Sequence, residues 1–317
     1  MSDKKSPYTA LFMTFVSVLI LTVLTSSNSR AGEAKINFKL LYKAAQIANQ
    51  TYDGSSEILG DFPQADKAWV ATPGRTEVQY VYLYSDERDV QVIAVRGTAN
   101  DTNWDLDMDT RGVKDQKAGI LMHRGFRTAA EAIYADVKPR LKNDVKIYLT
   151  GHSLGGAVAG ILGTYLVDDK FNVAGIFTFG QPKFTNAAGA RAYRDLPLIR
   201  VVYQNDIVAA LPNQTDGDEQ LYAHIGPVIN LLSGPHYIYL NRDQTLNISQ
   251  GSLQTFMTQI SVPDHKMKWY LQGLKDKIDH ATPVAVKDRN KYIVRHKMGV
   301  GVETAPTQKK FNFNQKQ

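Results

Sequence analysis

Residues 145–156 read Val-Lys-Ile-Tyr-Leu-Thr-Gly-His-Ser-Leu-Gly-Gly, a short β-rich run that ends in a serine flanked by glycines. The following residues, 154–167, form an apolar stretch of helical length that carries four glycines. The pentapeptide 151–155 fits the pattern G-x-S-x-G, and a serine on a sharp strand-to-helix turn is a nucleophile elbow. The glycines allow neighbouring backbone to approach the turn closely. This stretch therefore predicts an α/β fold and a nucleophilic serine, Ser153.

Strands and helices alternate on both sides of this turn. We expect strands at 145–150, 173–179 and 198–203, and helices at 126–141, 154–167 and 187–193. Such alternation is typical of βαβ units and a parallel sheet. The runs 78–84 and 90–95 predict an antiparallel hairpin, and the periodicity of residues 38–52 predicts an opening helix. The predicted fold class is α/β, with a mixed, mostly parallel central sheet flanked by helices.

The composition excludes several classes of protein. The chain has 317 residues, 43% of them hydrophobic, and contains no cysteine. The absence of cysteine excludes a disulfide scaffold, thiol catalysis and cysteine-ligated zinc. The formal charge of +6 would suit nucleic acid or an anionic membrane and specifies neither. Because no nucleic-acid recognition motif is present, we expect no nucleic-acid partner.

The N-terminus has the pattern of a secretory signal peptide. Two lysines precede an apolar run at 10–24, and residues 29–31, Ser-Arg-Ala, offer small side chains where signal peptidase reads them. A retained anchor is the alternative, because no charge occurs from residue 6 to residue 29. The run of 15 residues is shorter than the ~20 that a membrane-spanning helix needs. We expect a secreted or periplasmic protein, with the membrane anchor as the alternative.

A serine hydroxyl needs a base and an acid that orients the base, and in this architecture the acid precedes the histidine. Asp206 follows the strand predicted at 198–203, where α/β sheets place functional side chains. The other acids fit less well, because some end a helix and some crowd a polar loop. These are Asp168, Asp169, Asp216, Asp218 and Glu219.

Five histidines follow Asp206 in the chain: His224, His236, His265, His280 and His296. His265 stands just before the amphipathic stretch 267–274, and a loop that leads into a helix can place an imidazole over the elbow. Spacing alone prefers His265 only modestly. An oxyanion site would use the backbone N–H of Leu154, which follows the nucleophile, and Thr98, which follows the strand 90–95.

Further motifs occur in an order seen in one family. They are Arg96-Gly-Thr98, Asn103-Trp104 with Asp107, His123-Arg-Gly-Phe126, Gly151-His-Ser-Leu-Gly-Gly156, Thr178-Phe-Gly-Gln-Pro182, Asn205-Asp206 and Asp264-His265. In this order they resemble class 3 lipases, best known as fungal triacylglycerol lipases of the α/β-hydrolase fold. The resemblance spans roughly residues 38–275. It implies Ser153 as nucleophile, Asp206 as acid, His265 as base, and an oxyanion hole from Thr98 and Leu154.

One departure from the family concerns the lid. Family lids follow the oxyanion loop and usually form an apolar helix, whereas residues 99–104 are short and polar. This leaves an esterase or a phospholipase A1 of the same fold as alternatives. A catalytically inactive relative that binds lipid at a membrane is the alternative from another class. Asp105, Asp107 and Asp109 could bind calcium on a shared strand face, but a solvated face is the favoured interpretation.

The sequence therefore predicts a serine carboxylic-ester hydrolase that acts on acyl esters of glycerolipids without a metal or organic cofactor. We expect a signal peptide or anchor at 1–31, a catalytic domain at 32–280 and a basic tail at 281–317. Their formal charges are +2, −2 and +6. The tail is expected to be solvated, or to contact an anionic membrane surface through its lysines and arginines. The oligomeric state stays open.

Overall fold

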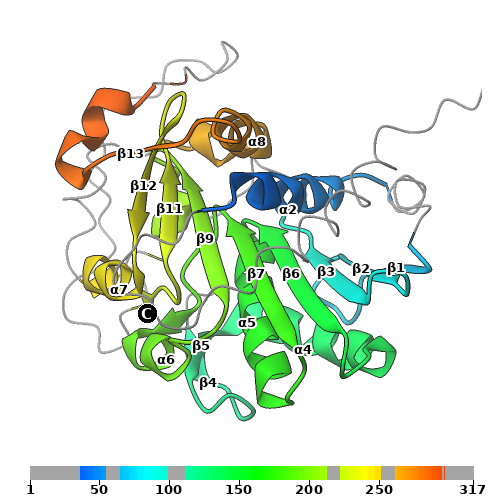
Figure 1. The fold of residues 1–317 in the computed structure, drawn as a ribbon. Helices are drawn as coiled ribbons and strands as arrows, with labels where there is room; N and C mark the ends of the chain where they lie inside the picture. Colours follow the sequence, from blue (N-terminus) through cyan, green and yellow to red (C-terminus); the bar gives the residue numbers. More distant parts are fainter. Residues whose placement is uncertain are drawn as a thin grey trace, which may run out of the picture.

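The computed structural model describes residues 36–54, 65–98, 111–212, 222–250, 261–294 and 296. Within them, nine strands form a central sheet in the order β1-β2-β3-β6-β7-β9-β11-β12-β13 (Figure 1). The bounds are β1 Lys67–Ala71, β2 Tyr80–Ser85, β3 Val90–Val95, β6 Lys146–His152, β7 Val173–Phe179, β9 Leu198–Tyr203, β11 Val228–Leu231, β12 His236–Leu240 and β13 Thr282–Pro283.

The centre of the sheet confirms the predicted α/β-hydrolase fold class. Strands β3, β6, β7, β9 and β11 pair in parallel, and β1, β2 and β3 pair in antiparallel fashion. The expected hairpin is β2–β3, in which Tyr80 lies opposite Val95. The parallel register places Thr150 opposite Phe177 and Phe179 opposite Val201. The carboxyl ends of these strands therefore meet at one edge of the sheet.

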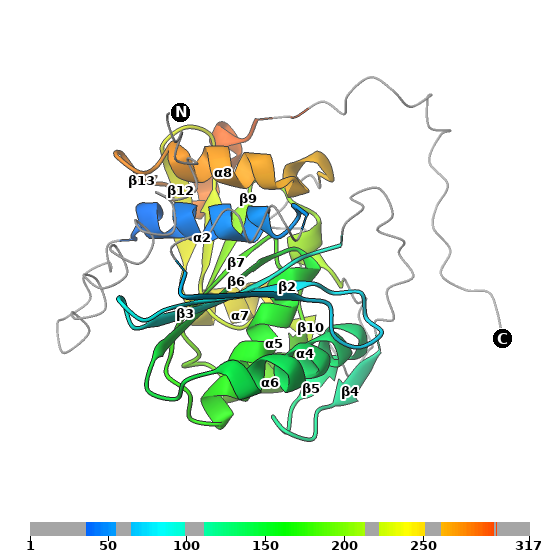
Figure 2. The ribbon, with the colours of Figure 1, turned by 90° about the vertical axis from the view of Figure 1, so that its right-hand side faces the viewer.

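Helices cover both faces of the sheet (Figure 2). Their bounds are α2 Phe38–Gln50, α4 Arg124–Val137, α5 Leu154–Asp168, α6 Ala187–Ala192, α7 Arg242–Gln250 and α8 Met267–Lys275. Helices α4 and α5 pack on one face, where Ile133 and Leu162 join Leu149 of β6 in one buried cluster. Helices α2 and α8 bury Ile47 and Leu274 on the other face. The predicted helices at 38–52, 126–141, 154–167 and 187–193 are α2, α4, α5 and α6.

The sequence does not predict several elements of the structure. A second sheet of four strands has the order β10-β8-β5-β4, with bounds Tyr222–Ala223, Thr185–Asn186, Leu121–His123 and Gly112–Lys114. Strands of two or three residues are too short to show a period of two. Strand β12 turns back along β11, and helix α7 follows it, so an antiparallel hairpin extends the sheet beyond β9.

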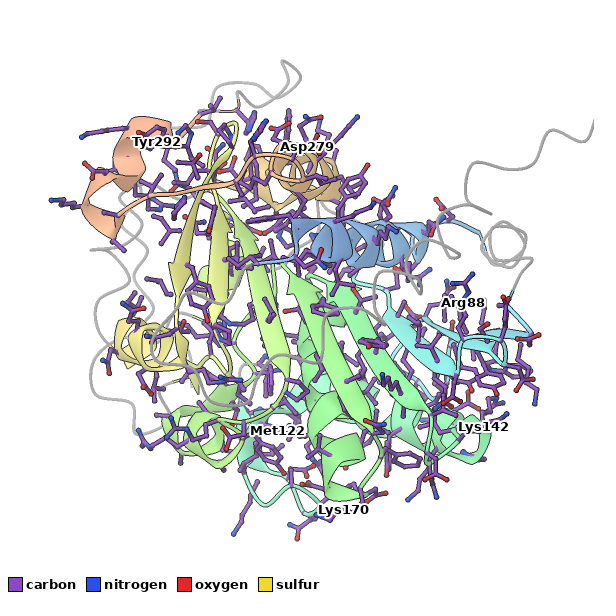
Figure 3. The ribbon with its side chains drawn as sticks, viewed as in Figure 1. Arg88, Met122, Lys142, Lys170, Asp279 and Tyr292 are labelled. Atoms are coloured by element: carbon purple, nitrogen blue, oxygen red, sulfur yellow. The ribbon has the colours of Figure 1, made fainter. Side chains whose placement is uncertain are left out.

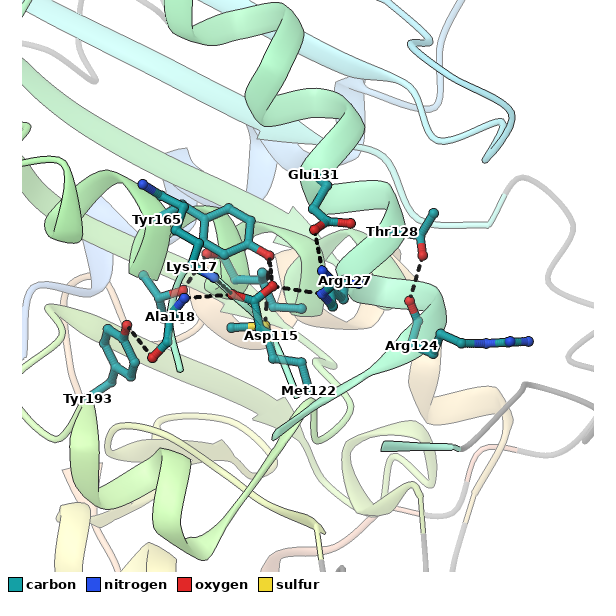
Figure 4. A network of polar contacts seen from close by, with 12 residues as sticks. Asp115, Lys117, Ala118, Met122, Arg124, Arg127, Thr128, Glu131, Tyr165 and Tyr193 are labelled. Atoms are coloured by element: carbon teal, nitrogen blue, oxygen red, sulfur yellow. Dashed lines mark hydrogen bonds and ion pairs between the residues drawn. The ribbon is translucent and has the colours of Figure 1, made fainter. Parts of the chain in front are cut away.

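A polar network fastens the second sheet to the helices below the central sheet (Figure 4). The buried carboxylate of Asp115 accepts hydrogen bonds from Arg127 Nε of α4 and the Tyr165 hydroxyl of α5, each at 2.7 Å. It also accepts from the backbone N–H of Ala118 at 2.6 Å. Burial raises the pKa of Asp115, but these hydrogen bonds and the charge of Arg127 outweigh it and lower the pKa overall.

The described part of the C-terminal segment, residues 281–294, is folded against the edge of the sheet, although most of its side chains are exposed. Strand β13 pairs in parallel with β12, and a 3₁₀ helix, η5 Val286–Tyr292, follows it. The ring of Tyr292 stacks on His236 at 3.9 Å between centroids, at the outer edge of the sheet (Figure 3). The boundary at residue 280 stays a prediction. The N-terminal run 10–24 lies outside the described residues, and no described helix is long and apolar enough to cross a membrane.

Candidate active site

The turn that carries Ser153 has the geometry expected of a nucleophile elbow. Ser153 connects β6 to α5 with φ 60° and ψ −133°, a left-handed conformation that costs a non-glycine residue roughly 1–3 kcal/mol. A Cβ on Gly155 would collide with the backbone of Val95, and a Cβ on Gly151 would lie 2.9 Å from the N atom of Gly156. The two glycines of the motif therefore allow the helix to start directly against β3.

The hydroxyl of Ser153 is buried, and within the described residues its Oγ has no hydrogen-bond partner. Hydrogen bonds between catalytic groups often form fully only in the complex with substrate, so this geometry is compatible with the predicted role of Ser153. Ser153 is also the N-cap residue of α5, so its Oγ lies at the positive end of the helix dipole.

Asp206 and His265, which are 59 residues apart in the chain, are in direct contact. His265 Nδ1 donates to Asp206 Oδ2 at 2.8 Å, and the aspartate is fully buried. The same carboxylate accepts from the backbone N–H of Val208 at 2.8 Å and from the hydroxyl of Tyr270. Three donors therefore fix the orientation of the carboxylate, and the carboxylate fixes the imidazole.

The topology explains how Asp206 and His265 meet. Asp206 follows β9, and it forms a parallel bridge with Ser261, four residues before His265. His265 ends a short 3₁₀ turn, Pro263–His265, that leads into α8. Gly180, after β7, leaves room for the pair, because a Cβ there would lie 2.7 Å from Asp206 Oδ2 and 2.9 Å from His265 Nδ1.

Sequence reasoning does not single out His152, which precedes the serine. Its Nε2 lies 2.8 Å from the carbonyl oxygen of His265, so Nε2 donates, and its Nδ1 then accepts from the Tyr52 hydroxyl at 2.8 Å. Burial, followed by the charge of His265, lowers the pKa of His152 well below its usual value. A neutral His152 therefore connects Tyr52, in the turn after α2, to the loop that carries His265.

The predicted oxyanion residues lie on two segments, the start of α5 and the turn after β3. Leu154 is the first residue of α5, and Thr98 is exposed at the end of the turn after β3. The turn comes close to the elbow at Gly97, where a Cβ would overlap the Tyr52 hydroxyl and lie 2.7 Å from the carbonyl oxygen of His152. The roles of Thr98 and Leu154 stay predictions.

The other candidates for acid and base have different partners. His224 Nε2 lies 2.8 Å from the carbonyl oxygen of Ala209, and His236 Nδ1 lies 3.0 Å from that of Ser233. His280 is exposed, and His296 Nε2 lies 3.0 Å from the Tyr203 hydroxyl. Among the described histidines, His265 alone is hydrogen-bonded to Asp206.

The alternative acids do not converge on the serine either. Asp168 accepts from the Tyr193 hydroxyl, and Asp169 pairs with Lys117 and Lys138 at the surface. Residues 213–221, with Asp216, Asp218 and Glu219, lie outside the described residues. So do residues 99–110, which include the stretch at the expected lid position and the aspartates considered for calcium. No group of three potential metal ligands occurs in the described ranges.

Known proteins are similar to this chain in sequence and in fold. The family described as Lipase (class 3) matches residues 92–216. A secreted mono- and diacylglycerol lipase of Fusarium solani is 33% identical over 177 residues, covering 52% of this chain and 50% of the relative. A triacylglycerol lipase of Nicotiana tabacum is 34% identical over 139 residues, covering 39% of this chain and 24% of the relative. The matched region thus spans half or less of these curated relatives.

The arrangement of the backbone also has counterparts among solved structures. The crystal structure of a lipase from Rhizopus microsporus var. chinensis superposes with a TM-score of 0.57 and 23% identity. The superposition covers 76% of this chain and 90% of that protein. At this identity the likeness bears on the fold, which is the α/β-hydrolase fold.

Proposed function

We propose that the chain is a serine carboxylic-ester hydrolase that cleaves acyl esters of glycerolipids, because residues 92–216 match the family Lipase (class 3) and the similar relatives are named lipases. The observation that carries this proposal is the buried His265–Asp206 hydrogen bond of 2.8 Å at the sheet edge that also presents the Ser153 elbow. A neutral imidazole with one nitrogen held by a carboxylate can accept a proton on the other.

In the proposed mechanism Ser153 Oγ attacks the ester carbonyl while His265 Nε2 takes the hydroxyl proton. The tetrahedral oxyanion is stabilised by Thr98 and by the backbone N–H of Leu154. When the C–O bond breaks, His265 returns the proton to the leaving alcohol and Ser153 keeps the acyl group. Water then attacks the acyl-enzyme with His265 as base, which releases the fatty acid. Asp206 orients the imidazole and stabilises its protonated form throughout.

Two variants test this mechanism. Purified Ser153→Ala should lose ester hydrolysis and labelling by a fluorophosphonate probe, while its circular dichroism stays that of the wild type. His265→Ala should be inactive, whereas His280→Ala, which changes an exposed histidine, should hydrolyse p-nitrophenyl butyrate at the wild-type rate. Wild-type activity in Ser153→Ala would contradict the mechanism. A wild-type protein that neither hydrolyses esters nor labels would favour the inactive lipid-binding alternative.

A panel of substrates is needed to determine which class of glycerolipid the protein hydrolyses. We propose acylglycerols, in line with the names of the Fusarium and Nicotiana relatives. Triacylglycerol, monoacylglycerol, phosphatidylcholine and short p-nitrophenyl esters should be assayed below and above the concentration at which each aggregates. Preferential hydrolysis of the phospholipid would support a phospholipase A1, and activity confined to dissolved esters would support an esterase.

We further propose that the protein is exported. The N-terminal pattern and the relative that is named as secreted support this proposal. Cleavage after Ala31 predicts a mature protein that begins at Gly32. N-terminal sequencing of protein recovered from the medium or periplasm would detect that start, whereas a full-length chain in the membrane fraction would indicate the anchor.

Contact with an anionic membrane is proposed for the basic end of the chain. Residues 297–317 hold four lysines and one glutamate, a net charge of +3. Each lysine near an anionic surface contributes ~1 kcal/mol, so removal of these residues should weaken binding to vesicles rich in phosphatidylserine. Neutral vesicles serve as the control, and equal binding by both forms to anionic vesicles would contradict this proposal.

A further inference from the structure

The buried side chain of Arg289 connects the C-terminal segment to the loop that carries Asp206. Arg289 lies on η5 and is 2% exposed. One terminal nitrogen, NH2, donates to the carbonyl oxygen of Gln204 and to Asn205 Oδ1, both at 2.7 Å, and Nε donates to Asn230 Oδ1 at 3.0 Å. A planar guanidinium can make such bonds in several fixed directions at once. These residues come from the loop after β9 and from β11, so Arg289 braces the loop from outside.

The loop after β9 has a strained backbone that other contacts must stabilise. Gln204 has φ 37°, in the left-handed region that is unfavourable for a non-glycine residue. Its carbonyl oxygen accepts from Asn230 Nδ2 at 3.0 Å as well as from Arg289. Its side chain accepts from the backbone N–H of Val294 at 2.7 Å, so the C-terminal segment holds Gln204 from two positions.

Asn205 links this brace to both members of the acid–histidine pair. Its side chain accepts from Arg289, and its backbone N–H donates to Asp264 Oδ2 at 3.0 Å. Asp264 directly precedes His265, and Asn205 directly precedes Asp206. A displacement of Asn205 would therefore move the carboxylate and the imidazole relative to each other.

The C-terminal segment is itself anchored on the sheet edge. The backbone N–H of Val284 donates to the Tyr237 carbonyl oxygen at 2.8 Å, and that of Ser233 donates to the Tyr292 carbonyl oxygen at 3.0 Å. Farther along, the ring of His296 stacks on Trp269 of α8 at 3.8 Å between centroids. These contacts on either side hold Arg289 in place.

We propose that Arg289 is a positioning residue for catalysis, so that the C-terminal segment contributes to the catalytic site through this side chain. The proposal rests on the function proposed above, in which Asp206 and His265 are the acid and the base. Arg289 acts on them through its hydrogen bonds to Gln204 and Asn205. Burial lowers its pKa only to about 10, so the guanidinium stays protonated near neutral pH.

The test compares Arg289→Met with Lys287→Met, which removes an exposed positive charge two residues away. Hydrolysis of p-nitrophenyl butyrate should show kcat lowered by up to about 100-fold in Arg289→Met, with KM nearly unchanged, because the reacting groups are misaligned. The acidic limb of its pH–rate profile should move to lower pH, since a displaced carboxylate stabilises the protonated imidazole less. Lys287→Met should match the wild type in both respects.

Chemical rescue separates positioning from a general loss of folding. In Arg289→Ala, millimolar guanidinium ion should restore part of kcat, whereas urea at the same concentration should not. Asn205→Ala should resemble Arg289→Met, and the double variant should be no worse than the poorer single variant. If Arg289→Met does not fold, the kinetics of Arg289→Lys and the guanidinium rescue of Arg289→Ala test the proposal instead.

Two results would overturn the proposal. One is a wild-type kcat and pH profile in folded Arg289→Met. The other is a loss of kcat that follows only the unfolded fraction, with no shift of the acidic limb and no rescue. Failure of the proposed function is distinguishable from both, because then the wild type itself would neither hydrolyse esters nor react with the fluorophosphonate.

Discussion

His152 donates a hydrogen bond from Nε2 to the backbone carbonyl of His265 across 2.8 Å. The residue beside the proposed nucleophile thus holds the loop of the proposed base. The rings also stack, with 4.5 Å between their centroids. The spacing between serine and imidazole therefore depends on a side chain that takes no part in proton transfer.

Replacing His152 should lower catalysis without abolishing folding. In His152→Phe a ring still fills the space, but the donor to the His265 carbonyl is lost, and we expect kcat to fall by roughly 10- to 100-fold. In Tyr52→Phe the ring of His152 loses its partner at Nδ1, and a smaller decrease is expected. Steady-state hydrolysis of p-nitrophenyl butyrate measures both. An unchanged kcat in His152→Phe would show that the carbonyl bond is dispensable.

Tyr270 should stabilise the proposed acid. Burial, and then the nearby Asp206, raise its pKa well above the usual value, so the hydroxyl remains a donor to the carboxylate. Removal of a hydrogen bond to a charged group costs about 1.5–3 kcal/mol. Tyr270→Phe should lose about that much in the free energy of unfolding by urea, and its kcat should fall by up to about tenfold.

The control for Tyr270 is Tyr193→Phe. This change removes a hydroxyl that donates to the Asp168 carboxylate at 2.7 Å, at the end of α5 away from the catalytic loops. It should lower stability and leave kcat unchanged. If both variants lose kcat equally, the effect of Tyr270 is not specific to the acid.

The sequence predicts the centre of the fold well because each element there is locally determined. The runs that form β6, β7 and β9 are short and β-rich, and the apolar stretch of α5 follows a glycine-rich turn. The second sheet escapes prediction because its strands have two or three residues, whose pairing depends on the rest of the fold.

The residues of the candidate site also differ in how far local sequence patterns predict them. Ser153 and Asp206 follow from local rules, the elbow motif and the end of a strand. Spacing favours His265 only modestly, and the family resemblance strengthens that choice. The bonds that support these residues join positions far apart in sequence, with separations of 100 residues for Tyr52–His152, 64 for Tyr270–Asp206 and 85 for Arg289–Gln204. No local pattern specifies such contacts.

Gly97 should be intolerant of a side chain. A Cβ there would overlap the Tyr52 hydroxyl and come within 3.1 Å of Ser153 Cβ. Gly97→Ala should displace the turn that presents Thr98 to the oxyanion, and kcat should fall by about 100-fold or more. Gly125→Ala is the matched control, because its Cβ would meet only the His123 ring at 3.5 Å and alanine favours the helix α4. A wild-type kcat in folded Gly97→Ala would contradict the close approach.

Acid should destabilise the protein through two buried histidines. Burial lowers the pKa of His152 and His224 well below the usual value, and the charges of Arg200 and Lys183 lower that of His224 further. In the unfolded chain both bind protons near pH 6.5, so below that pH the unfolded state binds more protons and the free energy of unfolding falls. Each histidine contributes a slope of up to about 1.4 kcal/mol per pH unit.

Urea denaturation between pH 5 and pH 7 measures that slope, in a window above the usual titration range of carboxylates. His224→Gln should reduce it by the share of one histidine, because a group that does not titrate takes its place. His280→Gln changes an exposed histidine and should leave the slope as in the wild type. If His224→Gln has the same slope as the wild type, burial does not keep His224 neutral in the folded protein.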